Sequence, residues 1–381
     1  MEVKQVHTLT NTATQEALGE SAVVLEDLSN IVDIGTEIFN ANAVDRYVRS
    51  LVNQIGRIVF VNRPYSGSVP SVLMDGWEFG SVMEKIQGEL PTATENESWE
   101  LVDGASYDPN IFYQPKVTAK FFNKMITFEI DRSYTEKQVK QSFQSATQLN
   151  AFLSMLYNDV EKAMTVRLDA LVMRTINNFI AETISDGDGV RAVNLLSRYK
   201  EMYPDSDLTA VRAVRNPEFI RFCVLEMANY IDRIQKISTL FNIGGKARFT
   251  PKDLLHVVML SEFRNAADVY LQSDTFHDNY TMLPNAETVP YWQGTGRAYE
   301  FEATSAIHVN TASNDEVVQS GILCVMFDRD ALGVLNPDRR VTTHYNPKAE
   351  FWTNFYKWDS RYFNDLNENF VVFYVDDEGE I

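Results

Sequence analysis

Few residues of this chain stand at spacings that could support catalysis or metal binding. Gly244-Gly245-Lys246 is similar to the end of a phosphate-binding loop, whose backbone amides cradle phosphate oxygens. However, Leu240 stands where such a loop needs its first glycine, and Ala247 follows the lysine in place of the required Ser or Thr. We therefore interpret these residues as an ordinary loop.

The acidic residues, histidines and cysteines also lack the spacing of a metal site. Asp186 and Asp188 begin like a calcium loop, but Val190 replaces the next oxygen ligand and no Glu closes the loop, which favours a turn. Neither Cys223 nor Cys324 lies near another ligand, and the histidines, at positions 7, 256, 277, 308 and 344, show no ligand pattern. The sequence therefore predicts no catalytic site, no metal and no cofactor, and hence no enzyme.

The composition indicates a folded, acidic protein. Of 381 residues, 45% are hydrophobic, which is enough to bury one large core or two modest ones. The chain has no apolar run of about 18 residues, which excludes a membrane-spanning helix. With 34 Lys and Arg against 53 Asp and Glu, the net charge is −19 and the basic residues are scattered. Such a surface opposes tight binding to nucleic acid phosphates.

The first third of the chain predicts an N-terminal arm, a strand and a long hairpin. Residues 1–45 are expected to form an extended arm with a short helix, followed by a strand at 55–61. Two strand-like segments come next, one around Trp77, Phe79 and residues 82–86, the other at 124–131, where Ile126, Phe128 and Ile130 alternate with polar residues. The long polar stretch between them predicts a β-hairpin that projects from the body and needs a partner elsewhere.

The strongest helix signal follows this hairpin. Residues 135–184 contain no Gly or Pro, and Ser133-Tyr134-Thr135-Glu136 offers a capping box. Apolar side chains recur every three or four residues, so we expect a long helix that packs on a sheet. The side chains expected to make that contact are Leu153, Val160, Met164, Leu168 and Leu171.

The second half is of mixed character. We expect helices over 217–237 and over the segment EFRNAADVYLQ, and buried strands at 254–260, 321–327 and 370–375, with a polar strand around 340–343. The aromatic-dense segment 351–363 could form a stacking platform for nucleic acid bases. Its basic residues are balanced by acids, so packing in the core or between subunits is favoured.

This order of elements resembles the major capsid proteins of tailed phages, whose shared architecture is called the Johnson fold. It is most similar to those of small short-tailed phages, from about residue 45 to 376. The segment LVNQIGRIVFVNR would enter the body, the hairpin would be the extended E-loop, and the long helix would be the spine helix. The segment DLLHVVML with the following helix resembles the axial domain, and ILCVMFDRDAL, RRVTT and NENFVVFYVDD resemble the closing strands of the peripheral domain.

The resemblance implies an α+β fold with defined domain limits. An N-terminal arm would cover 1–45, and the first part of the peripheral domain 46–185, including the E-loop (70–131) and the spine helix (135–184). The axial domain would cover 186–320, and the closing strands of the peripheral domain 321–381. Subunit contacts would come from aromatic residues of the E-loop, namely Trp77, Phe79, Trp99, Phe121 and Phe122.

The implied function is a structural shell subunit. Pentamers and hexamers of the chain would build an icosahedral capsid that encloses double-stranded phage DNA without specific binding and without a membrane. The expected partners are further copies of the chain, a scaffolding protein and a portal. Assembly would take place in the cytoplasm of the bacterial host, and the mature protein would be part of the virion.

Two alternatives remain open at this point. The shell of an encapsulin nanocompartment shares the fold but would load cargo proteins instead of DNA. A hydrolase with an unusual site belongs to a different class, and it would stay a small oligomer with a concave pocket.

Overall fold

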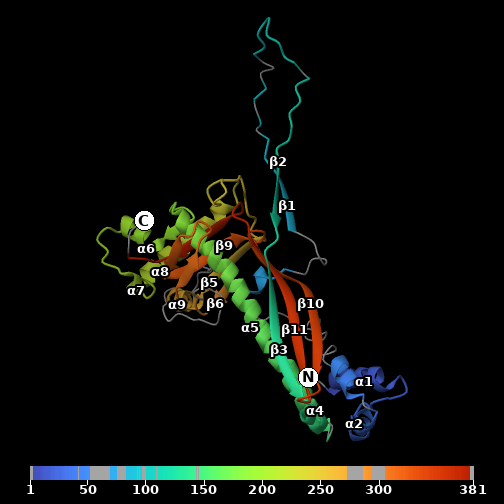
Figure 1. Ribbon diagram of the computed structural model, residues 1–381. Helices are drawn as coiled ribbons and strands as arrows, with labels where there is room; N and C mark the ends of the chain where they lie inside the picture. The colour runs from blue at the N-terminus through green and yellow to red at the C-terminus, as the bar shows by residue number, and fades with distance from the viewer. Residues whose placement is uncertain are drawn as a thin grey trace.

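The computed structural model describes residues 3–41, 43–51, 69–74, 83–91, 93, 95–96, 100–108, 110–142, 144, 146–272, 286–292 and 305–377. Its main core surrounds a five-stranded sheet of order β4-β12-β9-β5-β6 (Figure 1). The strands are β4 (Ala192–Asn194), β12 (Phe370–Tyr374), β9 (Ile322–Asp328), β5 (Leu255–Leu260) and β6 (Glu287–Val289). Every residue of β9 is buried, because its apolar run meets β12 on one side and β5 on the other. The predicted buried strands are thus confirmed.

Four of the described helices lie around this sheet. They are α6 (Leu195–Met202), α7 (Ala210–Ala213), α8 (Pro217–Ile234) and α9 (Ser261–Gln272). Helix α8 starts where the sequence dictates, because Asn216 Oδ1 accepts the backbone N–H groups of Glu218 and Phe219, and Pro217 occupies the first helical position. A small hairpin of β7 (Ile307–Asn310) and β8 (Glu316–Gln319) lies beside the sheet.

A second, long sheet has the order β10-β11-β3. It consists of β10 (Leu332–Asn346), β11 (Phe351–Asn364) and β3 (Met125–Thr135), all antiparallel. The aromatic-dense segment is therefore a strand, and its Trp352, Tyr356 and Trp358 are at most 1% exposed. They face inward together because residues two apart in a strand share one face of the sheet, and the preference for packing over base stacking is confirmed for these three rings.

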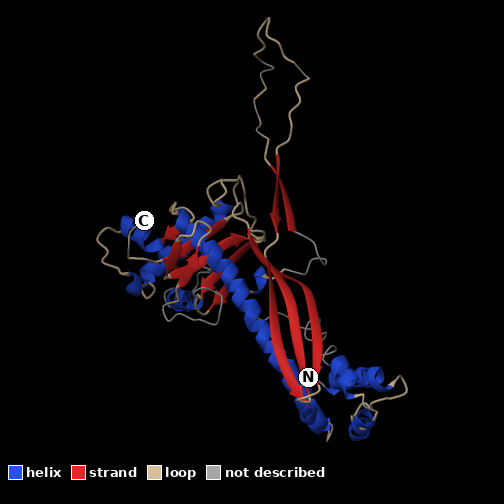
Figure 2. Cartoon of the chain, in the orientation of Figure 1, coloured by secondary structure: helices blue, strands red, loops and turns tan. Residues whose placement is uncertain are grey.

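The long helix α5 (Ala146–Asp186) runs along the three-stranded sheet and reaches the five-stranded one (Figure 2). It begins later than expected, because α4 (Glu136–Ser142) comes first. The capping box also lies two residues further on. The Thr135 N–H donates to Gln138 Oε1 at 3.0 Å, and the Gln138 N–H donates to Thr135 Oγ1 at 3.3 Å. Ser133 cannot cap because it still pairs with Thr353 in the sheet.

The N-terminal segment differs from the expected extended arm. It contains α1 (Val3–Leu18), α2 (Ile31–Asn40) and a further helical stretch over 44–51. Their apolar faces form a hydrophobic cluster with residues of α5 and β11, and the Trp352 Nε1–H donates to Asp45 Oδ1 at 2.9 Å. Each helix alone has too little apolar surface to be stable, so only this tertiary contact makes the segment helical.

A narrow hairpin projects from the body (Figure 1). It pairs β1 (Met83–Gly88) with β2 (Val117–Phe122), and the described parts of the loop between them extend away from both sheets. The prediction that residues 124–131 form the second strand of this hairpin is wrong, because those residues belong to β3 and pair with β11. The projecting part is therefore shorter than 70–131. No helix among the described residues could cross a membrane.

Candidate functional site

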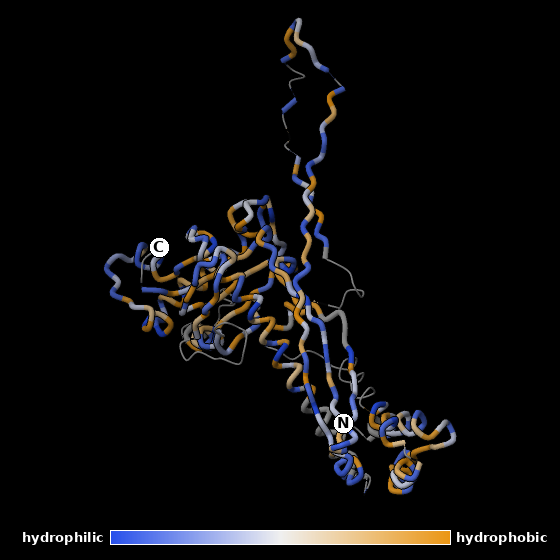
Figure 3. The backbone as a smooth tube through the Cα atoms, in the orientation of Figure 1, coloured by the Kyte–Doolittle hydropathy of each residue, from blue (hydrophilic) through white to orange (hydrophobic). Residues whose placement is uncertain are grey.

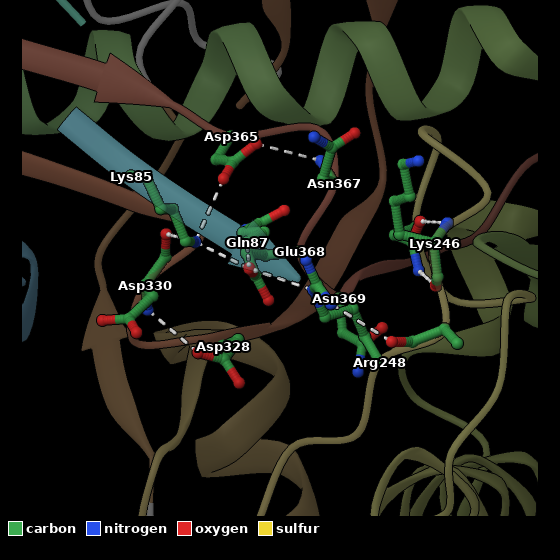
Figure 4. Close-up of polar contacts among 12 residues, drawn as sticks. Lys85, Gln87, Lys246, Arg248, Asp328, Asp330, Asp365, Asn367, Glu368 and Asn369 are labelled. Atoms are coloured by element: carbon green, nitrogen blue, oxygen red, sulfur yellow. Dashed lines mark hydrogen bonds and ion pairs between the residues drawn. The ribbon is translucent and has the colours of Figure 1, made fainter. Parts of the chain in front are cut away.

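The projecting hairpin is anchored to the body by ion pairs with two buried carboxylates (Figure 4). Lys85 Nζ on β1 lies 3.0 Å from Asp365 Oδ2 and 2.6 Å from Glu368 Oε1. Both carboxylates belong to the turn between β11 and β12, and the Asp365 side chain is fully buried. The same lysine donates to the Asp330 carbonyl oxygen at 3.4 Å. The half-buried amino group is thus held by two carboxylates and one carbonyl oxygen, which fixes β1 in one position.

The second hairpin strand reaches the same turn. Lys120 Nζ on β2 lies 2.9 Å from Asp365 Oδ1, so both strands pair with one carboxylate. Gln87 Nε2 donates to Glu368 Oε1 at 3.0 Å, and Arg248 Nε lies 3.2 Å from the same oxygen. We call Lys85, Gln87, Lys120, Arg248, Asp365 and Glu368 the hairpin anchor. Because it holds both strands, the anchor sets the direction in which the hairpin points.

The anchor lowers the pKa of Asp365. Burial raises the pKa of this carboxyl, but the hydrogen bond from Lys120 and the charge of Lys85 outweigh it, so the pKa lies below the ordinary value of 3.8. A carboxyl with a lowered folded pKa adds stability that is complete above its unfolded pKa and is lost as the pH falls through the folded pKa. The anchor should therefore be intact near neutrality and fail only below pH 3.8.

The Asp365→Asn variant tests the anchor. Near pH 7 we expect it to unfold more easily than the unmodified protein by about 2 kcal/mol, the size of a charge-assisted hydrogen bond. Between pH 6 and pH 3 the difference between the two proteins, measured by denaturant unfolding, should shrink. Glu129→Gln is a suitable control, because Glu129 pairs with Lys357 on an exposed sheet face. A difference that stays constant across this pH range would contradict the role given to Asp365.

Beyond the anchor, hydrophobic residues recur along the hairpin (Figure 3), and several of their side chains are exposed. Phe112 is 84% exposed and Tyr113 82% exposed, and the others are Leu90, Leu101, Val102, Tyr107 and Ile111. Residues 89–115 carry six acidic residues and no Lys or Arg. A soluble monomer rarely leaves so much apolar surface on one segment without a partner, so this surface is a candidate contact region.

The predicted hairpin contacts fall into three groups. Trp77, Phe79 and Trp99 lie outside the described residues. Phe121 is 62% exposed at the root of the hairpin. Phe122 packs on Phe363 of the body, with ring centroids 5.1 Å apart, and therefore supports the anchor more than a contact with another chain.

The predicted contacts of the long helix divide between two cores. Val160, Met164 and Leu168 are buried in the cluster that also contains the N-terminal helices, Trp352 and Tyr356. Leu171 is buried in the main core instead. The side chain of Leu153 lies outside the described residues. The helix thus connects two cores.

The other polar groups considered in the sequence have structural roles. Arg191 forms ion pairs with Asp186 and Asp188, so its guanidinium occupies the position where a calcium ion would have to bind. Lys246 pairs with Glu89 of the hairpin loop at 3.3 Å. Within the part of the chain that the structure describes, no three His, Cys, Asp or Glu side chains gather as a metal site.

His256 is half-buried at the edge of the main core, and both cysteines lie inside that core. His256 stacks on Phe327, with ring centroids 5.8 Å apart, and partial burial lowers its pKa. Cys223 and Cys324 are free and buried, and burial raises the pKa of both thiols. A protonated, buried thiol is a poor nucleophile.

The hairpin anchor is not predicted by the sequence. Lys85 and Glu368 are 283 residues apart, and no local pattern links them. The one local hint is the pair of acids, Asp365 and Glu368, in the segment 364–369. Acids in a turn between two strands are usually solvated, so this pair by itself does not predict an ion pair.

Comparisons with known proteins agree with this architecture. The sequence profile of the family described as Phi29-like phage major capsid protein matches residues 8–374. A chain in the capsid structure of Staphylococcus phage Andhra has a TM-score of 0.53 at 11% identity, covering 82% of this chain and 85% of that one. A chain in the structure of the head fiber and inner core protein gp22 of native bacteriophage P68 has a TM-score of 0.51 at 9% identity, covering 83% and 86%. No curated protein matches.

Proposed function

Because this chain belongs to the family of Phi29-like phage major capsid proteins, we propose that its copies assemble through the projecting hairpin into pentamers and hexamers of one shell. The chain is a structural protein of a tailed-phage icosahedral capsid, and its place is in the virion. The family match across residues 8–374 carries this conclusion. The family match does not support the encapsulin alternative, and it also argues against the hydrolase alternative, because the family is structural.

A further part of this proposal is a division of the subunit into two domains. Strands β9 and β12 pair with β5 and β4 in the five-stranded sheet, so we assign them with residues 186–320 to the axial domain, and the long sheet with α5 to the peripheral domain. The hairpin of β1 and β2 then extends from the peripheral domain toward a neighbour, supported by the anchor at its root. Rigid support matters because a long hairpin that could swing freely would lose binding free energy to ordering on contact.

We further assign a scaffolding protein, a portal and packaged double-stranded DNA as partners, with assembly in the cytoplasm of the bacterial host. Expression of the chain alone and together with a candidate scaffolding protein, followed by negative-stain electron microscopy, tests the assembly. Closed, regular shells of uniform size are the expected product in at least one of the two samples. If both yield only small oligomers of folded protein, the proposal that the chain builds a shell with this partner fails.

The acidic surface should keep DNA from adhering to the shell. The net charge of −19 and the scattered basic residues repel phosphates, which would ease both packaging and release. Fluorescence anisotropy with duplex DNA should therefore show negligible binding by purified subunits at ~150 mM salt, where a protein making several phosphate contacts still binds. Submicromolar, salt-sensitive binding would contradict this account of the inner surface.

A further inference from the structure

A pocket of about 580 Å³ lies beside the root of the hairpin. Its walls come from the junction of β2 and β3, from α5, from the β7–β8 hairpin and from the end of β11. The lining residues that matter here are Phe121, Lys124, Arg174, His308 and Tyr362. The pocket combines aromatic walls with cations, a composition suited to a ligand that has both an apolar and an acidic part.

The charges in this pocket are unevenly paired. Both of its glutamates have partners, since Glu182 Oε1 accepts the Ala312 N–H at 2.6 Å and Glu316 Oε1 is hydrogen-bonded to His308 Nε2. Arg174 is half-buried and stacks over the Tyr362 ring, 5.5 Å from its centroid. No carboxylate among the described residues forms an ion pair with Arg174 or with Lys124. A half-buried guanidinium held on an aromatic ring is a ready receptor for a carboxylate.

The tip of the hairpin has the complementary chemistry. Between residues 89 and 115 it carries six acids and no base, and Phe112 and Tyr113 are almost fully exposed. The tip lies far from the pocket of its own chain, because the hairpin points away from the body (Figure 1). The tip of a hairpin can therefore reach this pocket only from another copy.

We propose that the pocket around Arg174 receives the hairpin tip of a second copy of this chain. An acidic side chain of the tip pairs with Arg174 and Lys124, and an aromatic ring packs against Phe121 and Tyr362. This inference rests on the proposed assembly through the hairpin and names the receiving surface. It also gives Arg174 and Lys124 the acidic partner that no described residue of the subunit supplies.

Photo-crosslinking in assembled shells tests the contact directly. Tyr113 is replaced by the crosslinking amino acid p-benzoylphenylalanine, which keeps an aromatic side chain of similar shape, and assembled shells are irradiated. Mass spectrometry of the digested protein should find crosslinks to residues 121–124, 174–182, 308–316 or 362–366 of another copy. Crosslinks confined to other segments, or none from intact shells, would overturn the proposal, because a ring seated in the pocket lies within reach of these walls.

Charge reversal tests the role of the cation. Arg174→Glu should reduce the yield of closed shells by at least about tenfold, because like charges would meet in the contact. Arg174→Lys should keep most of the yield, and Lys162→Glu is the control, since Lys162 is an exposed cation of α5 outside the pocket. If Arg174→Glu melts early, Lys124→Glu at the exposed rim replaces it.

The two proposals fail in different ways. Shells that form normally with Arg174→Glu and Lys124→Glu would show that this pocket is not the receptor, while assembly through the hairpin would stand. Failure of the unmodified chain to form shells at all would instead count against the proposed function.

Discussion

Deleting residues 91–112 should leave a folded subunit that cannot close shells. The deletion removes the exposed apolar and acidic tip but keeps β1, β2 and the bond from the Glu89 N–H to the Lys116 carbonyl oxygen at 2.9 Å. It also keeps all residues of the hairpin anchor, and a shorter loop costs less entropy to close. The free energy of unfolding should therefore change little, because the deleted part that the structure describes buries no core residue.

Shell yield should fall to background, because each subunit would lose the surface through which it contacts its neighbour. Sedimentation and electron microscopy measure the yield, and thermal unfolding confirms that the subunit is folded. A matched variant replaces 91–112 by a Gly/Ser segment of equal length, which restores reach without side chains and should also fail. Regular particles from the deletion variant would contradict the role given to the hairpin. Regular particles from the replacement variant alone would show that only the length of the hairpin matters.

Leu168→Asp should destabilise the subunit by several kcal/mol, on the order of 4 kcal/mol, by burying an unpaired charge. Leu168 is 6% exposed and lies in the cluster where α5 meets the N-terminal helices and Trp352. We expect most of the variant to be insoluble, so assembly would fail because the subunit does not fold.

The yield of soluble protein and denaturant unfolding measure this effect. Val166→Asp is the matched control, since Val166 is on the same helix but exposed, and the change there should cost little. If Leu168→Asp proved soluble and assembled as well as Val166→Asp, the face of α5 that contains Leu168 would not be buried in the working subunit.

The class of the fold and most of its elements could be predicted from the sequence. Period-2 alternation at Ile126, Phe128 and Ile130 predicted β3, and the continuous apolar run at 322–327 predicted the central strand β9. The Gly- and Pro-free stretch that ends at Gly187, where φ is +59°, predicted the long helix α5. In each case the pattern is local, because burial of one face repeats with the period of the element itself.

Strand partners and helix ends were harder to predict. The strand at 124–131 was assigned to the projecting hairpin, yet its partner is β11, more than 200 residues later in the chain. The capping box was placed at Ser133, which the same sheet still holds. Pairing depends on which segments meet in space, and neither propensity nor periodicity contains that information.

The sequence by itself determined that this chain is an acidic α+β protein with a long helix and a long polar hairpin that does not pack on the rest of the subunit. It also showed the resemblance to the family, because that resemblance depends on the order of segments along the chain and not on how they fold. Only the tertiary structure decided that the N-terminal segment is helical and that the hairpin is held by Lys85 and Lys120 on the carboxylate of Asp365. It also decided that Arg174 lines a pocket in which no described carboxylate pairs with it. The physical reason is distance along the chain. Periodic patterns record the burial of neighbours in sequence, whereas buried ion pairs and pockets arise where remote segments meet, and there each charge is stabilised only by the partner that the fold brings to it.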